Sequence, residues 1–282
     1  MLQKRALLTS LSLGLPLFAF GCASNTTGEG ETSGSNETAS ANGTGRINLV
    51  ANGEAFVRQG FVTKDGWQID FDHVYVTLDD VKAYQSDPAF DPDQDEEIQA
   101  QNEVTLVSDP TTVDLAKGGE NADPIMVTQE KGKAGFYNAI SWKLATPEQG
   151  EQNSAIVLDG TAQKNGRTID FVLNLDKSIA YKCGEYVGDA RKGFLEADSK
   201  TELETTFHFD HIFGDAQAPA DDAINTGAVG FEPMAKLADN GTLKANLQTL
   251  QQQLSSENYQ TLEKAIKGLG HVGEGHCAET TT

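Results

Sequence analysis

Four of the five histidines lie in two short segments of the C-terminal third, and this clustering predicts a metal site. Residues 207–215 read FHFDHIFGD, and residues 270–277 read GHVGEGHC. Imidazole is the commonest nitrogen ligand of protein-bound metals, and three or four imidazoles suit Zn²⁺ or Cu²⁺. We therefore predict one zinc or copper ion held by four side chains: His208, His211, His271 and His276.

Each segment also contains a carboxylate that can ligate the metal or accept a hydrogen bond from an imidazole. These carboxylates are Asp210 and Glu274. Because protons compete with the metal for imidazole, we expect binding to weaken as the pH falls through about 6.5, the pKa of free histidine. The alternative is that His208 and His211 are hydrogen-bonded polar residues at a strand end, followed later by an unstructured tail.

The backbone must bring these two distant segments together. If 203–210 is a strand, His208 and Asp210 lie on the same face. His211 joins them only if the strand bends or ends there. We interpret the second segment as a loop, in which three glycines permit a tight backbone path: Gly270, Gly273 and Gly275.

The fifth histidine, His73, belongs to a stretch at 67–75 in which apolar and polar residues alternate. This alternation places His73 on the same face as Trp67, Ile69 and Phe71. His73 is therefore either a buried structural residue or a fifth metal ligand.

The N-terminal residues predict export. Two basic residues precede an apolar run at 6–20, and Gly21 then precedes Cys22. Such a run is typical of a signal peptide, here 1–21, and is short for a transmembrane span. The segment resembles bacterial lipoprotein signals, which implies that Cys22 is lipidated. The two residues before Gly21 depart from the usual Leu and small residue of such signals, and a plain secretory signal is the alternative.

Residues 23–45 contain no large apolar side chain and are rich in Gly, Ser, Thr and Asn. This composition predicts that 22–45 comprises the lipidated Cys22 and a flexible linker. A lipidated cysteine, a polar linker and a globular body together indicate a domain held at a membrane surface. We therefore expect a lipid-anchored protein of the bacterial cell envelope, at the outer membrane or in the periplasm.

Cys183 and Cys277 are the cysteines left once Cys22 carries lipid. An even number of cysteines in an oxidising compartment predicts a disulfide between them. Such a bond holds the C-terminal segment to the body. The alternative is two unpaired, buried thiols.

The pattern along the body predicts a mainly β fold, namely an antiparallel β-sandwich over 46–215. Alternating runs predict strands at 47–51, 67–78, 104–107, 136–144, 155–160 and 168–175. The Asn165-Gly166 pair predicts a hairpin turn, because both positions need a positive φ. Helical spacing predicts helices at 243–254 and 257–269, with Ser255 or Ser256 as the cap of the second. We therefore expect 216–282 to be a small helical appendage whose histidine-rich tail packs on the sandwich.

The chain is strongly acidic, with 42 acidic and 21 basic residues and a net charge of −21. This charge excludes ordinary nucleic-acid binding, and contact with an anionic membrane needs an anchor. The densest acidic run, DPAFDPDQDEE at 87–97, can hold calcium through oxygen ligands. It lacks the turn glycine and distal Glu of an EF-hand loop, which favours a solvated acidic loop.

The two histidine segments resemble the paired signatures of a poorly characterised family of bacterial metal-binding lipoproteins. There an HxDHxF segment ends a β-rich body, and a GHxxGEGHC segment lies near the C-terminus. The resemblance extends loosely over 65–282 and implies an exported, metal-binding lipoprotein. The family's calcium-loop-like segment between the signatures is reduced here to residues 238–241.

Together these features predict a protein that captures, buffers or transfers zinc or copper, with an unidentified metal donor or acceptor protein as partner. One alternative is a metal-dependent hydrolase, for which Glu274 is the candidate base. The chain contains no HExxH or GxSxG pattern, so we expect a binding protein rather than an enzyme. A surface adhesion or assembly module without metal is a further alternative.

Overall fold

The structure is a computed structural model that describes residues 43–147, 154–188 and 192–281. These residues belong to one compact unit. The predicted signal peptide (1–21), Cys22 and the linker up to residue 42 lie outside the described residues. No helix within the described ranges has both the length and the apolar character needed to cross a membrane.

Fourteen strands of the described chain form one large sheet. Its strands are β1 (Thr44–Asn52), β2 (Phe61–Val62), β3 (Gln68–Ser86), β4 (Ala100–Val107), β5 (Thr111–Asp114), β6 (Ile125–Lys133), β8 (Ala139–Leu144), β9 (Ile156–Lys164), β10 (Arg167–Leu175), β11 (Ile179–Cys183), β13 (Lys200–Phe207), β14 (Thr242–Asn246), β15 (Gly270–Val272) and β16 (Gly275–Thr281). A separate ribbon pairs β7 (Gly135–Phe136) with β12 (Phe194–Leu195).

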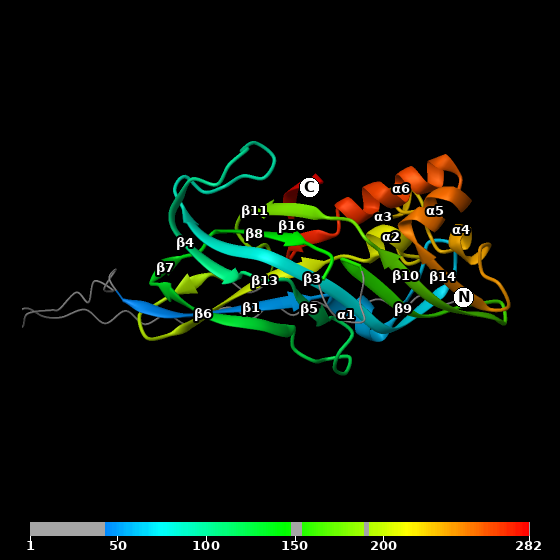
Figure 1. Ribbon diagram of the computed structural model, residues 1–282, viewed down its shortest axis with the longest axis horizontal. Helices are drawn as coiled ribbons and strands as arrows, with labels where there is room; N and C mark the ends of the chain where they lie inside the picture. Colours follow the sequence, from blue (N-terminus) through cyan, green and yellow to red (C-terminus); the bar gives the residue numbers. More distant parts are fainter. Residues whose placement is uncertain (1–42, 148–153, 189–191, 282) are drawn as a thin grey trace, which may run out of the picture. The chain divides into compact units, whose positions relative to one another are not determined.

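The strand order is β14-β10-β9-β3-β8-β11-β16-β15-β13-β1-β6, and β2, β4 and β5 also pair with β3 (Figure 1). Most neighbours are antiparallel, whereas β1 with β13 and β10 with β14 are parallel. The sheet curls around one hydrophobic core, so the predicted mainly β, sandwich-like class is confirmed. Each of the predicted strand runs overlaps a strand of the structure.

The predicted hairpin turn is confirmed between β9 and β10. Asn165 and Gly166 have φ values of 51° and 79°, and the strands pair on both sides of the turn. At the N-terminal end, β1 begins at Thr44 rather than after the predicted linker boundary at 45. The reason is that strand pairing uses backbone groups, so small residues can join it, and Thr44 pairs with Lys133 of β6.

The predicted single face at 67–75 is wrong, because β3 contains a bulge. Its pairing with β9 shifts register between Phe71 and His73, where an extra residue is inserted. Ile69 is buried before the bulge, but Val74 is buried after it, so the buried positions change from odd to even. His73 therefore lies on the exposed face instead of among the apolar side chains.

The helices of the described chain are short and lie together beside one end of the sheet, except for the first (Figure 1). They are α1 (Glu54–Gln59), α2 (Asp210–Phe213), α3 (Ala223–Gly227), α4 (Glu232–Ala235), α5 (Leu247–Gln253) and α6 (Ser256–Lys267). The predicted cap is confirmed, since the Ser255 side chain accepts a hydrogen bond from the backbone N–H of Asn258 at the start of α6.

The helix predicted at 243–254 is only partly correct. Its first part is strand β14, which pairs in parallel with β10 and directs Leu243 and Ala245 into the core. Asn246 then ends the strand and caps α5 by accepting a hydrogen bond from Thr249. The gain from completing the sheet outweighs helix propensity over these few residues.

The histidine-rich tail is not a loop packed on the outside of the sheet. Residues 270–281 form the hairpin of β15 and β16, which lies within the sheet between β13 and β11. The predicted helical appendage at 216–282 therefore ends in strands that belong to the body (Figure 1). This inserted hairpin positions the histidines described next.

Candidate metal centre

The first histidine pair lies where β13 becomes a helical turn. β13 ends at Phe207 and α2 begins at Asp210, so 203–210 is not one continuous strand. The helical turn brings the side chains of His208 and His211, three residues apart in the sequence, to the same side, with ring centroids 5.6 Å apart. The strand end that the sequence required for His211 to join His208 is thus present.

The second pair is a cross-strand pair of the hairpin. His271 of β15 lies directly opposite His276 of β16, with ring centroids 4.9 Å apart. β15 also pairs with β13, which brings the His271 ring to 4.4 Å from His208 and 5.1 Å from His211. Ring contacts therefore connect the four histidines that the sequence analysis selected.

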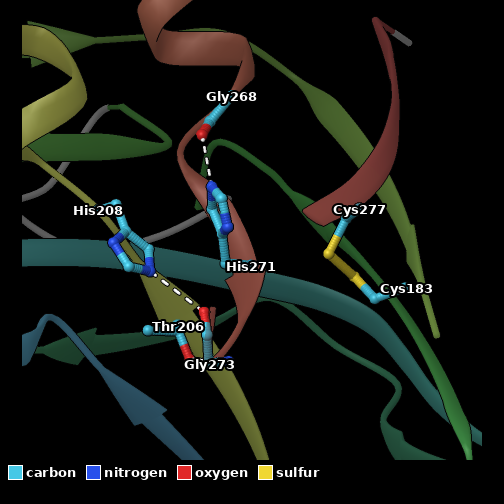
Figure 2. Close-up of a disulfide and its surroundings, with 7 residues drawn as sticks. All are labelled: Cys183, Thr206, His208, Gly268, His271, Gly273 and Cys277. Atoms are coloured by element: carbon cyan, nitrogen blue, oxygen red, sulfur yellow. Dashed lines mark hydrogen bonds between the residues drawn. A yellow bond between two sulfur atoms is a disulfide. The ribbon is translucent and has the colours of Figure 1, made fainter. Parts of the chain in front are cut away.

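The hairpin turn needs glycine at Gly273. Its φ is +61°, and a Cβ there would lie 2.0 Å from the carbonyl oxygen of Val187. The Gly273 N–H donates to Oγ1 of Thr206, whose hydroxyl donates to buried Glu204. Thus the side chains of β13 fix the turn beside His208 (Figure 2).

The predicted disulfide is confirmed. Cys183 and Cys277 are bonded across a separation of 94 residues, at directly opposed positions of β11 and β16. Cys277 directly follows His276 in the sequence. The bond ties the hairpin to β11, the strand on its other side (Figure 2). The hairpin is thereby held by β13 on one edge and by β11 on the other.

In His208, His211 and His271, one ring nitrogen donates a hydrogen bond to a backbone carbonyl. The Gly268 carbonyl, just after α6, accepts hydrogen bonds from Nδ1 of His211 at 2.8 Å and Nε2 of His271 at 3.1 Å. The Gly273 carbonyl accepts from Nε2 of His208 at 3.2 Å (Figure 2). A carbonyl only accepts, so each of these nitrogens carries the proton and the other nitrogen of a neutral ring has a free lone pair.

The unprotonated nitrogens are Nε2 of His211, Nδ1 of His271, and Nδ1 of His208, which lies 3.4 Å from Oε2 of Glu54. Donor atoms of His208, Asp210 and His211 all lie within 4.8 Å of one another, so this group can hold a metal ion. In the described part of the chain, Oδ1 of Asp210 and Nδ1 of His271 are buried without a hydrogen-bond partner. Leaving a buried polar atom unpaired costs about 1–3 kcal/mol, and coordination of a metal would satisfy it. The residues present therefore fit a transition-metal ion.

Burial sets the protonation of this group. It lowers the pKa of His211, and it lowers the pKa of His271 to about 3, with further lowering by His208 and His211. Burial also raises the pKa of Asp210, against the lowering effect of the two nearby imidazoles. His211 and His271 are neutral at pH 7, which is the form that binds metal.

Glu54 is a member of the site that the sequence analysis missed. Its Oε2 lies 3.4 Å from Nδ1 of His208, and burial raises its pKa. The parallel pairing of β1 with β13 explains the contact, since it ends at Asn52 opposite Thr206, two residues before Glu54 and His208. Glu54 and His208 are far apart in the sequence, and only the parallel register of β1 and β13 brings them together.

Outside the group of mutually close donors lie His271 and His276, described above, and two further candidates, Glu274 and His73. Glu274 is exposed in the turn between β15 and β16, and its charge raises the pKa of Glu54 as a lesser cause after burial. His73 is exposed on β3, where Nδ1 lies 2.8 Å from Oδ2 of Asp114 and the ring stacks on Tyr75. The hydrogen bond with Asp114 raises the pKa of His73.

A cleft of about 530 Å³ opens beside the histidines. His211, His271 and His276 line it, together with Asp93 from the acidic loop. In that loop the carboxylates of Asp91 and Asp95 accept hydrogen bonds from the loop's own backbone. The acidic loop thus lies at the same cleft as the histidines.

The paired-signature family proposed from the sequence is not tested by comparison with known proteins. No protein-family model matches the chain, and no curated protein or solved structure matches it. What the structure itself establishes is a His208, Asp210 and His211 group that can hold a metal ion, with His271 beside it.

Proposed function

We propose that this is an exported, lipid-anchored bacterial protein that binds zinc or copper for capture, buffering or transfer. The observation that carries the proposal is the set of imidazoles around Asp210. His208, His211 and His271 each have one nitrogen bound to a backbone carbonyl and one nitrogen left for a metal. This is the usual way in which proteins orient metal-binding imidazoles.

The donor set favours a transition metal over calcium or magnesium. Calcium and magnesium take oxygen ligands, whereas imidazole nitrogens suit zinc and copper. The negative charge of the chain, −21, raises the local concentration of any cation at its surface. The carbonyl of Gly268 also marks the partly negative C-terminal end of α6, which further favours a cation there.

The envelope location rests on different observations. The signal-like 1–21 segment, Cys22 and the polar linker support export and lipid anchoring. The Cys183–Cys277 disulfide supports an oxidising compartment such as the periplasm or the cell surface.

Metal binding is tested by elemental analysis of the native protein and by titration of the metal-free protein with Zn²⁺ and with Cu²⁺. We expect one equivalent of metal to bind, and His208→Ala or His211→Ala to weaken it by at least about tenfold. His73→Ala is the matched control, since it removes a histidine outside the cluster, and should bind within about threefold of wild type. Wild-type affinity in both cluster variants would refute the site.

The anchor is tested separately by fractionating cells that produce wild type or Cys22→Ala. We expect wild type in the membrane fraction and the variant released from it. Quantitative membrane association of the variant would refute the lipid anchor without bearing on metal binding.

A further inference from the structure

His276 occupies a different position from the other three histidines of the cluster. It is exposed, whereas His208 and His271 are 8% and 4% exposed. Within the described chain its ring contacts run to His271 and not to His208 or His211. Nor does it belong to the group of donors that lie within 4.8 Å of one another. The four rings therefore form a path from the surface inward rather than one shell.

The cleft follows the same path. It is lined by exposed His276, by buried His271 and by His211 of the inner group. Nδ1 of His271, midway along this path, is buried and has no hydrogen-bond partner in the described chain. A cation in the cleft would therefore meet one imidazole at the surface and a second, unpaired nitrogen behind it.

The acidic loop places a carboxylate at the outer end of the path. Asp93 and His276 line the cleft together and also line an adjoining hollow of about 330 Å³. Lys182 of β11 holds the loop by bonding the backbone carbonyl of Glu96 and the carboxylate of Glu97. The loop is thus attached to the strand that carries Cys183, beside the hairpin.

We propose that this cleft is the route by which the metal reaches and leaves the buried group, with Asp93 and His276 as its outer, transient ligands. This inference deepens the proposed function and rests on it. The metal contacts His276 only in passing and then moves to Nδ1 of His271 and the inner donors. A transient ligand lowers the barrier to metal binding and the barrier to metal release by the same amount. It therefore changes both rates without changing their ratio, which is the affinity.

The test measures Zn²⁺ uptake and release by stopped flow with a chromophoric chelator, and affinity by equilibrium competition with the same chelator. We expect His276→Ala to slow uptake and release by about tenfold each while affinity stays within about threefold. Asp93→Asn should slow uptake more than Glu96→Gln. Glu96→Gln removes the same charge from the same loop but not from the cleft. His208→Ala serves as the reference for loss of a resident ligand.

Two results would overturn the route without refuting the proposed function. If His276→Ala loses affinity as His208→Ala does, His276 is a resident ligand and the proposed function still holds. If His276→Ala matches wild type in both rates and affinity, the metal takes another path. Failure of wild type to bind Zn²⁺ or Cu²⁺ would instead refute the proposed function and the route with it. Circular dichroism and absence of free thiols establish that each variant is folded.

Discussion

Backbone hydrogen bonds decide which nitrogen of each buried imidazole is available. The Gly268 carbonyl alone orients both His211 and His271, although these residues come from different segments. His211 is thereby left with Nε2 and His271 with Nδ1. The site depends on a carbonyl that no motif identifies.

The pKa values of His211 and His271 should lie below 6.5, and that of His73 should lie above it. In metal-free protein we expect His211 and His271 to stay neutral well below pH 6.5, because burial lowers their pKa values. His73 should remain charged above pH 6.5, because its hydrogen bond with Asp114 raises its pKa. The measurement is an NMR titration of the imidazole resonances, and titration of His271 near 6.5 would contradict the expected burial.

These shifts also give the sign of their effect on stability. A lowered pKa means that only the unfolded chain takes up the proton, so His211 and His271 make folding less favourable as pH falls below 6.5. For His271 this loss extends down to about pH 3. The raised carboxyl pKa values of Asp210 and Glu54 act in the opposite sense. For His211 and His271, protons should therefore compete with the metal only below pH 6.5, the value expected from free imidazole.

Glu54 should contribute to metal affinity as a carboxylate beside Nδ1 of His208, the nitrogen that this ring offers to the metal. Glu54→Gln removes the negative charge 3.4 Å from Nδ1 of His208, and we expect Zn²⁺ affinity to fall by about tenfold or more. Glu103→Gln is the matched control, because Glu103 pairs with Lys82 on another part of the sheet. Equal affinity for the two variants, measured by chelator competition, would show that Glu54 is not part of the site.

At the scale of elements, the hairpin of β15 and β16 is what joins the two histidine segments. It pairs with β13 on one side and with β11 on the other, so His271 is directed toward His208 while His276 faces the cleft. The turn of this hairpin depends on the positive φ of Gly273, a backbone conformation that residues other than glycine rarely adopt.

Gly273→Ala should therefore destabilise the protein. Holding an alanine in the left-handed backbone region costs about 1–2 kcal/mol of stability, and the clash with the Val187 carbonyl adds to this cost. Gly119→Ala is the control, since a Cβ there meets no atom within 4 Å and its φ is not positive. Chemical denaturation should show a lower unfolding free energy for Gly273→Ala alone. Equal values for both variants would mean that the turn rearranges freely.

At the scale of the whole molecule, the disulfide connects the end of the chain to the middle of the sheet. Its residues are 94 apart, so the bond restricts the unfolded chain over a long loop as well as fixing the hairpin. The same bond therefore bears on both the candidate metal site and the stability of the fold.

We expect the double variant Cys183→Ser, Cys277→Ser to lose about 2–5 kcal/mol of unfolding free energy. It should also bind Zn²⁺ more weakly than wild type, because β16 is then held to β11 by strand pairing alone. Denaturation and chelator competition measure the two effects. Unchanged Zn²⁺ affinity in the folded double variant would show that strand pairing is sufficient to position His271.

Local and compositional features were predictable from the sequence. Alternation identified the strands, because side chains of a strand point to opposite faces whatever its partners are. The Asn165-Gly166 turn and the Ser255 cap were predictable because each depends on a few adjacent residues. The disulfide was predictable from the even number of cysteines left in a chain that is expected to be exported.

The register between distant strands was decided only in the tertiary structure. The bulge in β3 turned His73 to the exposed face, and parallel pairing with β10 made 242–246 a strand rather than a helix. The parallel register of β1 and β13 placed Glu54 beside His208. Sequence spacing describes only neighbours along one segment, whereas these contacts arise from backbone hydrogen bonds between segments far apart in the chain. The residue types of the candidate metal site are therefore readable in the sequence, but the free nitrogens and the path to solvent are set by the fold.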